Sequence, residues 1–154
     1  MIVKISTLFE CSVEQFWQEI LKPDSLQYAS YPIMTFRPLD GVNLSETWKV
    51  GQVYKVKLVF LNLIPLGEHA IKLKEINRET NTIVSNESGR LAPVWNHTIR
   101  FNQAFVNMIE YEDEIEIQAG WRTVFIWLFA NWFYRHRQNR WKKRLKELGY
   151  GADI

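Results

Sequence analysis

The C-terminal segment constrains this sequence most, because an unbroken helical pattern follows a long run of strand-like patterns. From Ala119 to about Leu148 the segment predicts one long helix, and Gly149 with Gly151 provides the stop signal after it. A single long helix after many strands is typical of an α+β domain in which the helix packs on the concave face of a curved antiparallel sheet.

The patterns before this helix predict one strand, two short helices and about six further strands. Ser12 and Gln15 form a capping-box signature for a first helix that stops at Pro23, and Asp24 is the expected N-cap of a second helix. Short connections favour a meander of neighbouring strands, and no linker or repeat divides the expected domain, 1–154. The predicted strands cover residues 2–10, 33–39, 52–61, 69–74, 81–88, 94–101 and 108–117.

Composition narrows the classes of function. The chain has 47% hydrophobic, 23% charged and 14% aromatic residues, with seven Trp, and large rings can line pockets for apolar ligands. Cys11 is the only cysteine, which excludes an intrachain disulfide and favours a reducing, cytoplasmic location. The three histidines lack metal-ligand spacing, so we predict no metal and no cofactor. A net charge of +2 without a recognition motif argues against nucleic acid as a partner.

The positive charge is concentrated in the C-terminal helix. Residues 119–154 carry 8 Lys or Arg and 2 Asp or Glu, net +6, while residues 1–118 carry net −4. This segment could contact an anionic membrane surface or a partner protein, although basic residues near a helix C-terminus also complement its dipole. The apolar stretch Val124–Phe133 is about half of the ~20 residues that a membrane span requires.

Three local stretches, together with the order of elements, resemble the START-like superfamily, also called SRPBCC or the helix-grip fold. They are Ser12–Trp17 in the first helix, Trp95–Phe101 with its Trp-x-His pattern, and Tyr111–Ile115 followed by Tyr134–Gln138. The superfamily includes polyketide cyclases and lipid-transfer domains. The resemblance implies a helix-grip fold, but the same fold hosts binding, transfer and catalysis.

A stripe on the C-terminal helix predicts a cavity beneath it. Apolar residues recur at alternating spacings of three and four, but Asn131, Tyr134 and Gln138 interrupt them, and buried polar groups need partners. A second stripe, Phe125, Leu128 and Trp132, could instead face the sheet. The predicted cavity lining is Tyr54, Val56, Leu58, His69, Ile71, His97, Ile99, Tyr111, Trp127, Asn131, Tyr134 and Gln138.

The last hairpin contains a candidate catalytic pair. Four glutamates alternate with inward residues that include Asp113, and a register that pairs Phe101 with Ile109 places His97 opposite Asp113. A carboxylate orients an imidazole for general-base catalysis, and it also forms purely structural buried pairs.

These observations lead to three hypotheses. The first is the binding or carrying of a hydrophobic small molecule, such as a lipid, an isoprenoid or a polyketide-like compound. The second is a cyclase, dehydratase or hydrolase that uses His97 as its base and Asp113 as its orienting partner. The third is an adaptor that contacts a membrane or a partner protein through the basic helix.

Overall fold

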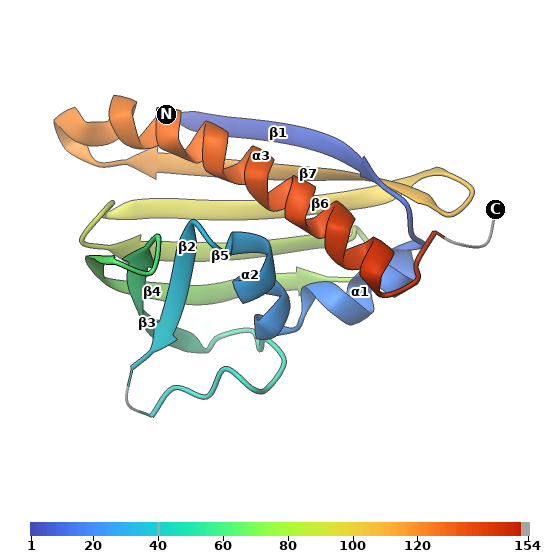
Figure 1. The fold of residues 1–154 in the computed structure, drawn as a ribbon, viewed down its shortest axis with the longest axis horizontal. Coiled ribbons are helices and arrows are strands. Elements are labelled where there is room, and N and C mark those ends of the chain that lie inside the picture. The colour runs from blue at the N-terminus through green and yellow to red at the C-terminus, as the bar shows by residue number, and fades with distance from the viewer. Residues whose placement is uncertain (40, 152–154) are drawn as a thin grey trace.

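The computed structural model describes residues 1–39 and 41–151; residue 40 and the last three residues of the expected domain lie outside this part. Seven strands and three α-helices follow one another in the described residues, with a short 3-10 turn before the last helix (Figure 1). In chain order the elements are β1 Ile2–Phe9, α1 Val13–Ile20, α2 Pro23–Ser30, β2 Met34–Pro38, β3 Val53–Phe60, β4 Ile64–Asn77, β5 Thr82–Gly89, β6 Val94–Phe105, β7 Met108–Gln118, η1 Gly120–Arg122 and α3 Thr123–Glu147.

All seven strands form one antiparallel sheet in the order β1-β7-β6-β5-β4-β3-β2. Six consecutive strands are neighbours, as the short connections predict, and β1 closes the order beside β7. Figure 1 shows α3 lying across one face of this sheet, with α1 and α2 beside its C-terminal part. The predicted helix-grip fold, with a long C-terminal helix and two short helices after the first strand, is confirmed.

Alternation along β7 determines which face of the sheet is buried. Ile109, Tyr111, Asp113, Ile115 and Ile117 are all buried toward α3, as predicted. The glutamates between them point to the other face, where Glu112 and Glu114 both form ion pairs with Lys4 and Arg100.

The register predicted for the last hairpin is wrong by two residues. Phe101 pairs with Tyr111, and His97 pairs with Ile115 rather than Asp113. The expected loop from residue 102 to 107 is strand as far as Phe105, followed by a tight turn in which Asn107 has a φ of 52°. An irregularity between Gln103 and Phe105 then shifts the pairing. A bulge of this kind leaves the alternation pattern on either side intact, so periodicity alone does not locate it.

Two helix starts also differ from the prediction. Pro23 is the first residue of α2, with Lys22 at the N-cap, so Asp24 lies in the first turn and does not cap the helix. The last helix was expected from Ala119 and begins at Thr123, because Gly120 has a φ of 59° and residues 120–122 form a 3-10 turn.

Aromatic rings fill the space between helix and sheet at the α1 end. Phe16 of α1 contacts Phe101, Tyr111 and Trp141, with ring centroids 4.8 to 5.4 Å apart. Phe9 and Trp17 extend the same cluster. These large buried rings leave little room here, so any cavity under α3 must lie farther along the sheet.

Side chains hold α3 on both of its flanks. On the β1 side, Trp127 Nε1 donates to the carbonyl oxygen of Ile2, and Gln138 Nε2 donates to that of Ile5. On the α2 side, Arg140 Nε donates to the carbonyl oxygen of Tyr28, whose hydroxyl donates to Glu147. The helix is therefore held at a defined distance from the sheet.

Candidate functional site

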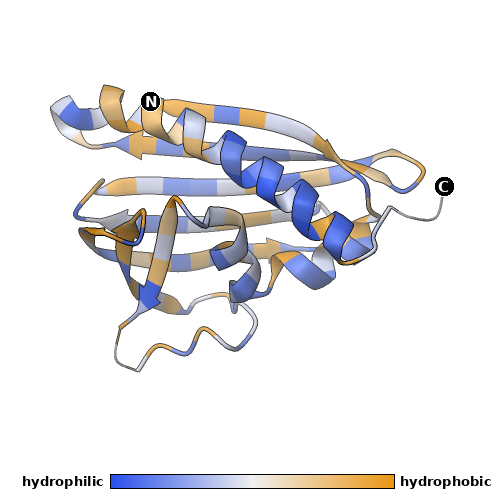
Figure 2. Cartoon of the chain, in the orientation of Figure 1, coloured by the Kyte–Doolittle hydropathy of each residue, from blue (hydrophilic) through white to orange (hydrophobic). Residues whose placement is uncertain are grey.

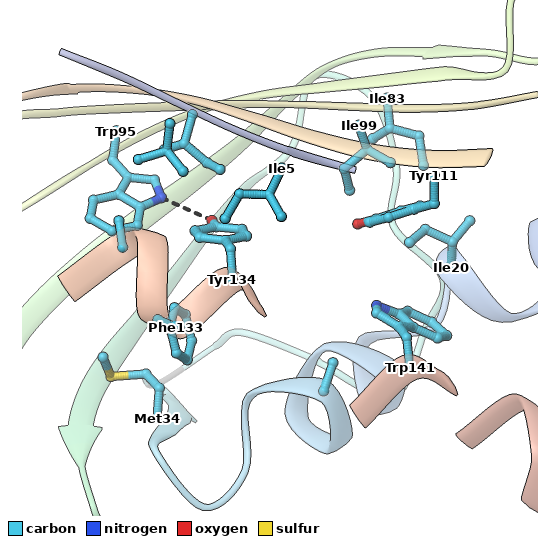
Figure 3. Packing of buried hydrophobic residues seen from close by; sticks show 14 of the residues in the cluster. Ile5, Ile20, Met34, Ile83, Trp95, Ile99, Tyr111, Phe133, Tyr134 and Trp141 are labelled. Carbon is cyan, nitrogen blue, oxygen red and sulfur yellow. Dashed lines mark hydrogen bonds between the residues drawn. The ribbon is translucent and has the colours of Figure 1, made fainter. Parts of the chain in front are cut away.

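A cavity of about 100 Å³ lies between α3 and the middle of the sheet. Its apolar lining comes from α1, α2, β2–β6 and α3, and includes Phe36, Ile71 and Phe133. Figure 3 shows Phe133 and Tyr134 of α3 below Trp95 of the sheet, and Trp141 farther along the helix below Tyr111. The volume is below the ~150 Å³ of an engineered apolar cavity that binds benzene, so it limits the ligand to about one ring.

One wall of the cavity is polar. It consists of inward-facing side chains from three neighbouring strands together with two from α3, and we call it the polar wall. Its members are His69, Ser85, Glu87, His97, Tyr134 and Arg137.

Glu87 is held at the centre of this wall by two donors. Its carboxylate lies 2.8 Å from His69 Nε2 and accepts a 2.7 Å hydrogen bond from Ser85 Oγ. Burial raises the pKa of Glu87, but the hydrogen bond and charge of His69 outweigh burial and lower it below its ordinary value. The carboxylate is therefore ionised and has a partner on each oxygen.

Asp113 lies behind the wall and joins three elements, β6, β7 and α3. Its Oδ1 is 2.7 Å from His97 Nε2 and accepts a 2.7 Å bond from the Tyr111 hydroxyl, while Oδ2 accepts from Gln138 Nε2 at 3.0 Å. The contact with His97 is thus made diagonally across β6 and β7, although the two residues are not paired in register. Burial raises the pKa of Asp113, but the hydrogen bond and charge of His97, followed by Arg137 and Tyr111, lower it overall.

Arg137 differs from the two carboxylates because it has no hydrogen-bonding partner within residues 1–39 and 41–151. Its side chain is buried at 6% exposure, and it makes no hydrogen bond or ion pair with any residue that the structure describes. The guanidinium lies over the ring of Tyr134, 4.9 Å from the ring centroid. Burial lowers the pKa of Arg137, but Tyr134 and Asp113 nearby raise it above its ordinary value, so the group stays charged.

Six of the twelve residues predicted to line the cavity do so in the structure. They come from β3, β4, β6 and α3 and are Leu58, His69, Ile71, His97, Ile99 and Tyr134.

The other six predicted residues lie outside the lining, for separate reasons. Val56 is fully packed within the core, and the Tyr54 hydroxyl bonds to Gln52 and to the amide of Lys49. Tyr111 and Gln138 are turned toward Asp113, as described above.

Trp127 and Asn131 lie outside the cavity because α3 is rotated relative to the predicted stripe. Trp127 reaches the backbone of β1, and Asn131 Nδ2 bonds to the carbonyl oxygen of Trp127 within the helix. The face toward the cavity follows a four-residue spacing, Phe129, Phe133, Arg137 and Trp141. The alternative stripe, Phe125, Leu128 and Trp132, is exposed.

Sequence reasoning did not single out Ser85, Glu87 and Arg137. Ser85 and Glu87 alternate with the buried Ile83 in a predicted strand, a signal that assigning a face to this strand would have revealed. Arg137 is one of the basic residues of the C-terminal segment, and its four-residue spacing from Phe133 and Trp141 places it inward. Among residues 1–39 and 41–151, no group of three or more His, Cys, Asp or Glu is arranged to hold a metal ion.

Comparison with solved structures establishes the fold. A protein from Chromobacterium violaceum, CV1439, superposes with a TM-score of 0.73 at 11% identity, covering 92% of this chain and 94% of its own. A START superfamily protein from Mycobacterium smegmatis has a TM-score of 0.66 at 10% identity, covering 96% and 98%. The ginseng major latex-like protein 151 from Panax ginseng has a TM-score of 0.64 at 11% identity, covering 94% and 96%. The fold is START-like.

At the level of sequence, the profile of a family described as a domain of unknown function, DUF8410, matches residues 7–145. No curated protein matches the sequence.

Replacing Asp113 by Asn tests how far the fold depends on this carboxylate. The variant leaves His97 and Tyr111 without an ionised acceptor, and breaking a buried pair of this kind costs about 3–5 kcal/mol. We expect the free energy of unfolding, measured with urea, to fall by this amount. Glu110→Gln, an exposed change on the same strand, is the control and should alter it by less than about 0.5 kcal/mol.

The ionised Asp113 carboxylate should also make the stability of the fold depend on pH. Because the pKa of Asp113 is lower in the folded chain than in the unfolded one, its ionised form stabilises the fold. The contribution is complete above the unfolded pKa, about pH 4, and is lost as the pH falls through the folded pKa. Wild-type protein should therefore lose more stability than Asp113→Asn between pH 5 and pH 2. Equal losses would contradict the assignment.

Proposed function

Since the chain belongs to the DUF8410 family and has a START-like fold, we propose that it binds a small hydrophobic molecule in the cavity beneath α3. The observation that carries the proposal is the cavity itself, apolar on most sides and polar on one. Ligand pockets commonly combine an apolar lining with a few oriented polar groups.

The size of the cavity sharpens the choice among the ligands considered. A volume of about 100 Å³ suits a single ring or a short branched chain. A long lipid or isoprenoid chain would have to displace side chains of the helix face, such as Phe129 and Phe133, which stack at 5.5 Å. The volume therefore favours a compact compound of one ring over an extended acyl chain or a polyketide of several rings.

Filling the cavity should weaken ligand binding. Ala92 lines it and is buried, so Ala92→Leu places three additional carbons in this space. We expect the Kd for cyclohexylmethanol, a neutral one-ring probe, to rise about tenfold or more in a ¹H–¹⁵N titration. Ala104→Leu, the same change at an exposed position of β6, should leave the Kd unchanged. No saturable binding by wild-type protein, of this probe or of a panel of apolar rings, would contradict the proposal.

Catalysis by His97 is a second candidate function, supported by the orientation of its ring. Nε2 faces Asp113, and Nδ1, on the other side of the ring, bonds to no described residue. The neighbouring Tyr134 ring lies 5.1 Å from the imidazole. An imidazole oriented by a carboxylate on one side and facing a cavity on the other has the arrangement of a general base.

Proton abstraction by His97 predicts isotope exchange in a bound ketone. In D₂O, cyclohexanone should exchange the hydrogens next to its carbonyl group faster with wild-type protein than with His97→Gln, as followed by NMR. We expect the enzymatic component to fall at least about a hundredfold, the lower range for general-base catalysis. His136→Gln, a change at a histidine outside the cavity, is the control. Equal exchange rates in a folded His97→Gln variant would leave the His97–Asp113 pair with a structural role only.

An exposed apolar surface supports a third candidate function, contact with an anionic membrane. We call it the apolar rim, and it consists of exposed apolar residues of η1 and of the first half of α3. They are Trp121, Val124, Phe125, Leu128 and Trp132. Figure 2 shows α3 changing from hydrophobic and neutral in this half to hydrophilic in its C-terminal half. No helix among the described residues is long and apolar enough to cross a bilayer.

The positive charges beside the apolar rim favour an anionic membrane as the partner of this surface. Arg122 and Arg135 are exposed at its two ends. Parts of the basic segment named from the sequence are already engaged within the chain, because Arg144 pairs with Asp24 and Arg137 is buried. Exposed aromatic rings next to basic residues are typical of surfaces that lie in the headgroup region of anionic bilayers.

Vesicle binding tests the apolar rim directly. Phe125→Ser should reduce binding to phosphatidylglycerol-containing vesicles about tenfold in a sedimentation assay, because a ring at 67% exposure is lost. Phe105→Ser is a matched control, since Phe105 is 66% exposed in the β6–β7 hairpin, away from the apolar rim. Equal effects of the two changes, or equal binding to neutral vesicles, would argue against this candidate.

A further inference from the structure

The polar wall contains one charged group whose hydrogen-bond donors find no acceptor among the described residues, and this is the Arg137 guanidinium. It lines the cavity, its side chain is 6% exposed, and its Nε has no partner among the described residues. A guanidinium carries five N–H donors and no acceptor, and burying such a charge without acceptors costs several kcal/mol. The rings of Tyr134 and Phe133, with centroids 4.9 and 6.0 Å away, offset part of this cost.

Neither buried carboxylate hydrogen-bonds to Arg137, although the charge of each raises the pKa of its guanidinium. Asp113 has three donors, from His97, Tyr111 and Gln138. Glu87 has two, from His69 and Ser85. Arg137 influences the ionisation of Asp113, which shows that it is near, but no bond joins them. The donors of Arg137 are thus left for a group that enters the cavity.

Tyr134 supplies a second donor beside Arg137. Its oxygen accepts a 3.2 Å hydrogen bond from Trp95 Nε1, drawn in Figure 3, so the oxygen is positioned while the hydroxyl proton has no acceptor among the described residues. Burial raises the pKa of Tyr134, which keeps this proton in place. One turn of α3 therefore presents a charged and a neutral donor at the same wall of the cavity.

From this geometry we propose that the ligand is a small apolar carboxylic acid, with its carboxylate held by Arg137 and by the Tyr134 hydroxyl. The inference rests on the proposed binding function and names the ligand class. A carboxylate matches the planar, forked donor set of a guanidinium, and charge-assisted hydrogen bonds are about twice as strong as neutral ones. The small volume restricts the rest of the ligand to about one ring or a short branched chain.

Two probes with one carbon skeleton test the proposal. Cyclohexanecarboxylate carries the charge, and cyclohexylmethanol does not. We expect wild-type protein at pH 7 to bind the acid roughly ten- to hundredfold more tightly than the alcohol, as charge-assisted bonds from Arg137 imply. Arg137→Gln should remove this advantage and leave the Kd for the alcohol within about twofold.

The control variant makes the same change outside the cavity. Arg135→Gln removes one positive charge from an exposed residue two positions earlier in α3, whose guanidinium bonds to the carbonyl oxygen of Asn131. It should not change the preference for the acid. Tyr134→Phe should weaken binding of the acid by less than Arg137→Gln does, because it removes one neutral donor.

A measurement on wild-type protein covers the case in which Arg137→Gln does not fold. The carboxyl ¹³C signal of labelled cyclohexanecarboxylate should show that the bound acid remains ionised at a pH where the free acid is protonated. The Nε–H signal of Arg137 should shift on addition of the acid and much less on addition of the alcohol.

The outcomes distinguish the carboxylate site from the more general binding of a hydrophobic molecule. Binding of the alcohol without any preference for the acid, or an equal loss for both probes in Arg137→Gln, would overturn the carboxylate site and leave the binding function standing. Failure of both probes to bind wild-type protein would count against the binding function itself. Preference for the acid that Arg137→Gln alone removes would support both.

Discussion

The Asp113 carboxylate is the interaction on which the rest of this structure depends. Its three hydrogen bonds reach His97 on β6, Tyr111 on its own strand and Gln138 on α3, and Gln138 continues to the backbone of β1. One buried group thereby sets both the orientation of an imidazole and the position of the helix over the sheet. Because burying ions is costly, a chain with an apolar residue at this position could be equally stable. An apolar residue could not orient the His97 ring or position the helix through hydrogen bonds. The main contribution of the carboxylate is therefore to orient the groups around it.

The cavity follows from how the helix is held. Gln138 and Trp127 attach α3 to β1, and Arg140 with Tyr28 attaches it to α2, so the helix cannot settle freely onto the middle strands. Large rings fill the α1 end, where Phe16 meets Trp141 at 5.1 Å. Between these supports, the inner face of β3–β6 meets only part of the helix surface, and space remains. Polar side chains from those strands line one side of that space, so the cavity can orient a ligand as well as accommodate it.

Much of this architecture could be predicted from the sequence, because alternation and helix signals are local. The four glutamates of β7 identified its outer face, and the length of the last segment identified α3. The register of the last hairpin could not be predicted, since a bulge near Gln103 leaves no mark in the hydrophobic pattern. The rotation of α3 was also hidden. Its first half is apolar nearly all round, so Trp127 and Phe129 are equally plausible inward residues until the contacts with β1 are known. Arg137 was not assigned a face, because it is one basic residue among many in this segment.

The contrast between the carboxylates and Arg137 bears on what the cavity selects. A buried guanidinium would weaken the binding of a purely apolar molecule. Such a ligand would remove water from the charge without supplying hydrogen-bond acceptors. Asp113 and Glu87 show that this chain can satisfy buried charges where it uses them for structure. Arg137 has no hydrogen-bond acceptor in the described part of the chain, and burying it in this way lowers the stability of the fold. Such a cost is reasonable only where another group supplies the acceptors. The selectivity of the cavity then resides in Arg137, while the apolar lining limits the size of what it accepts.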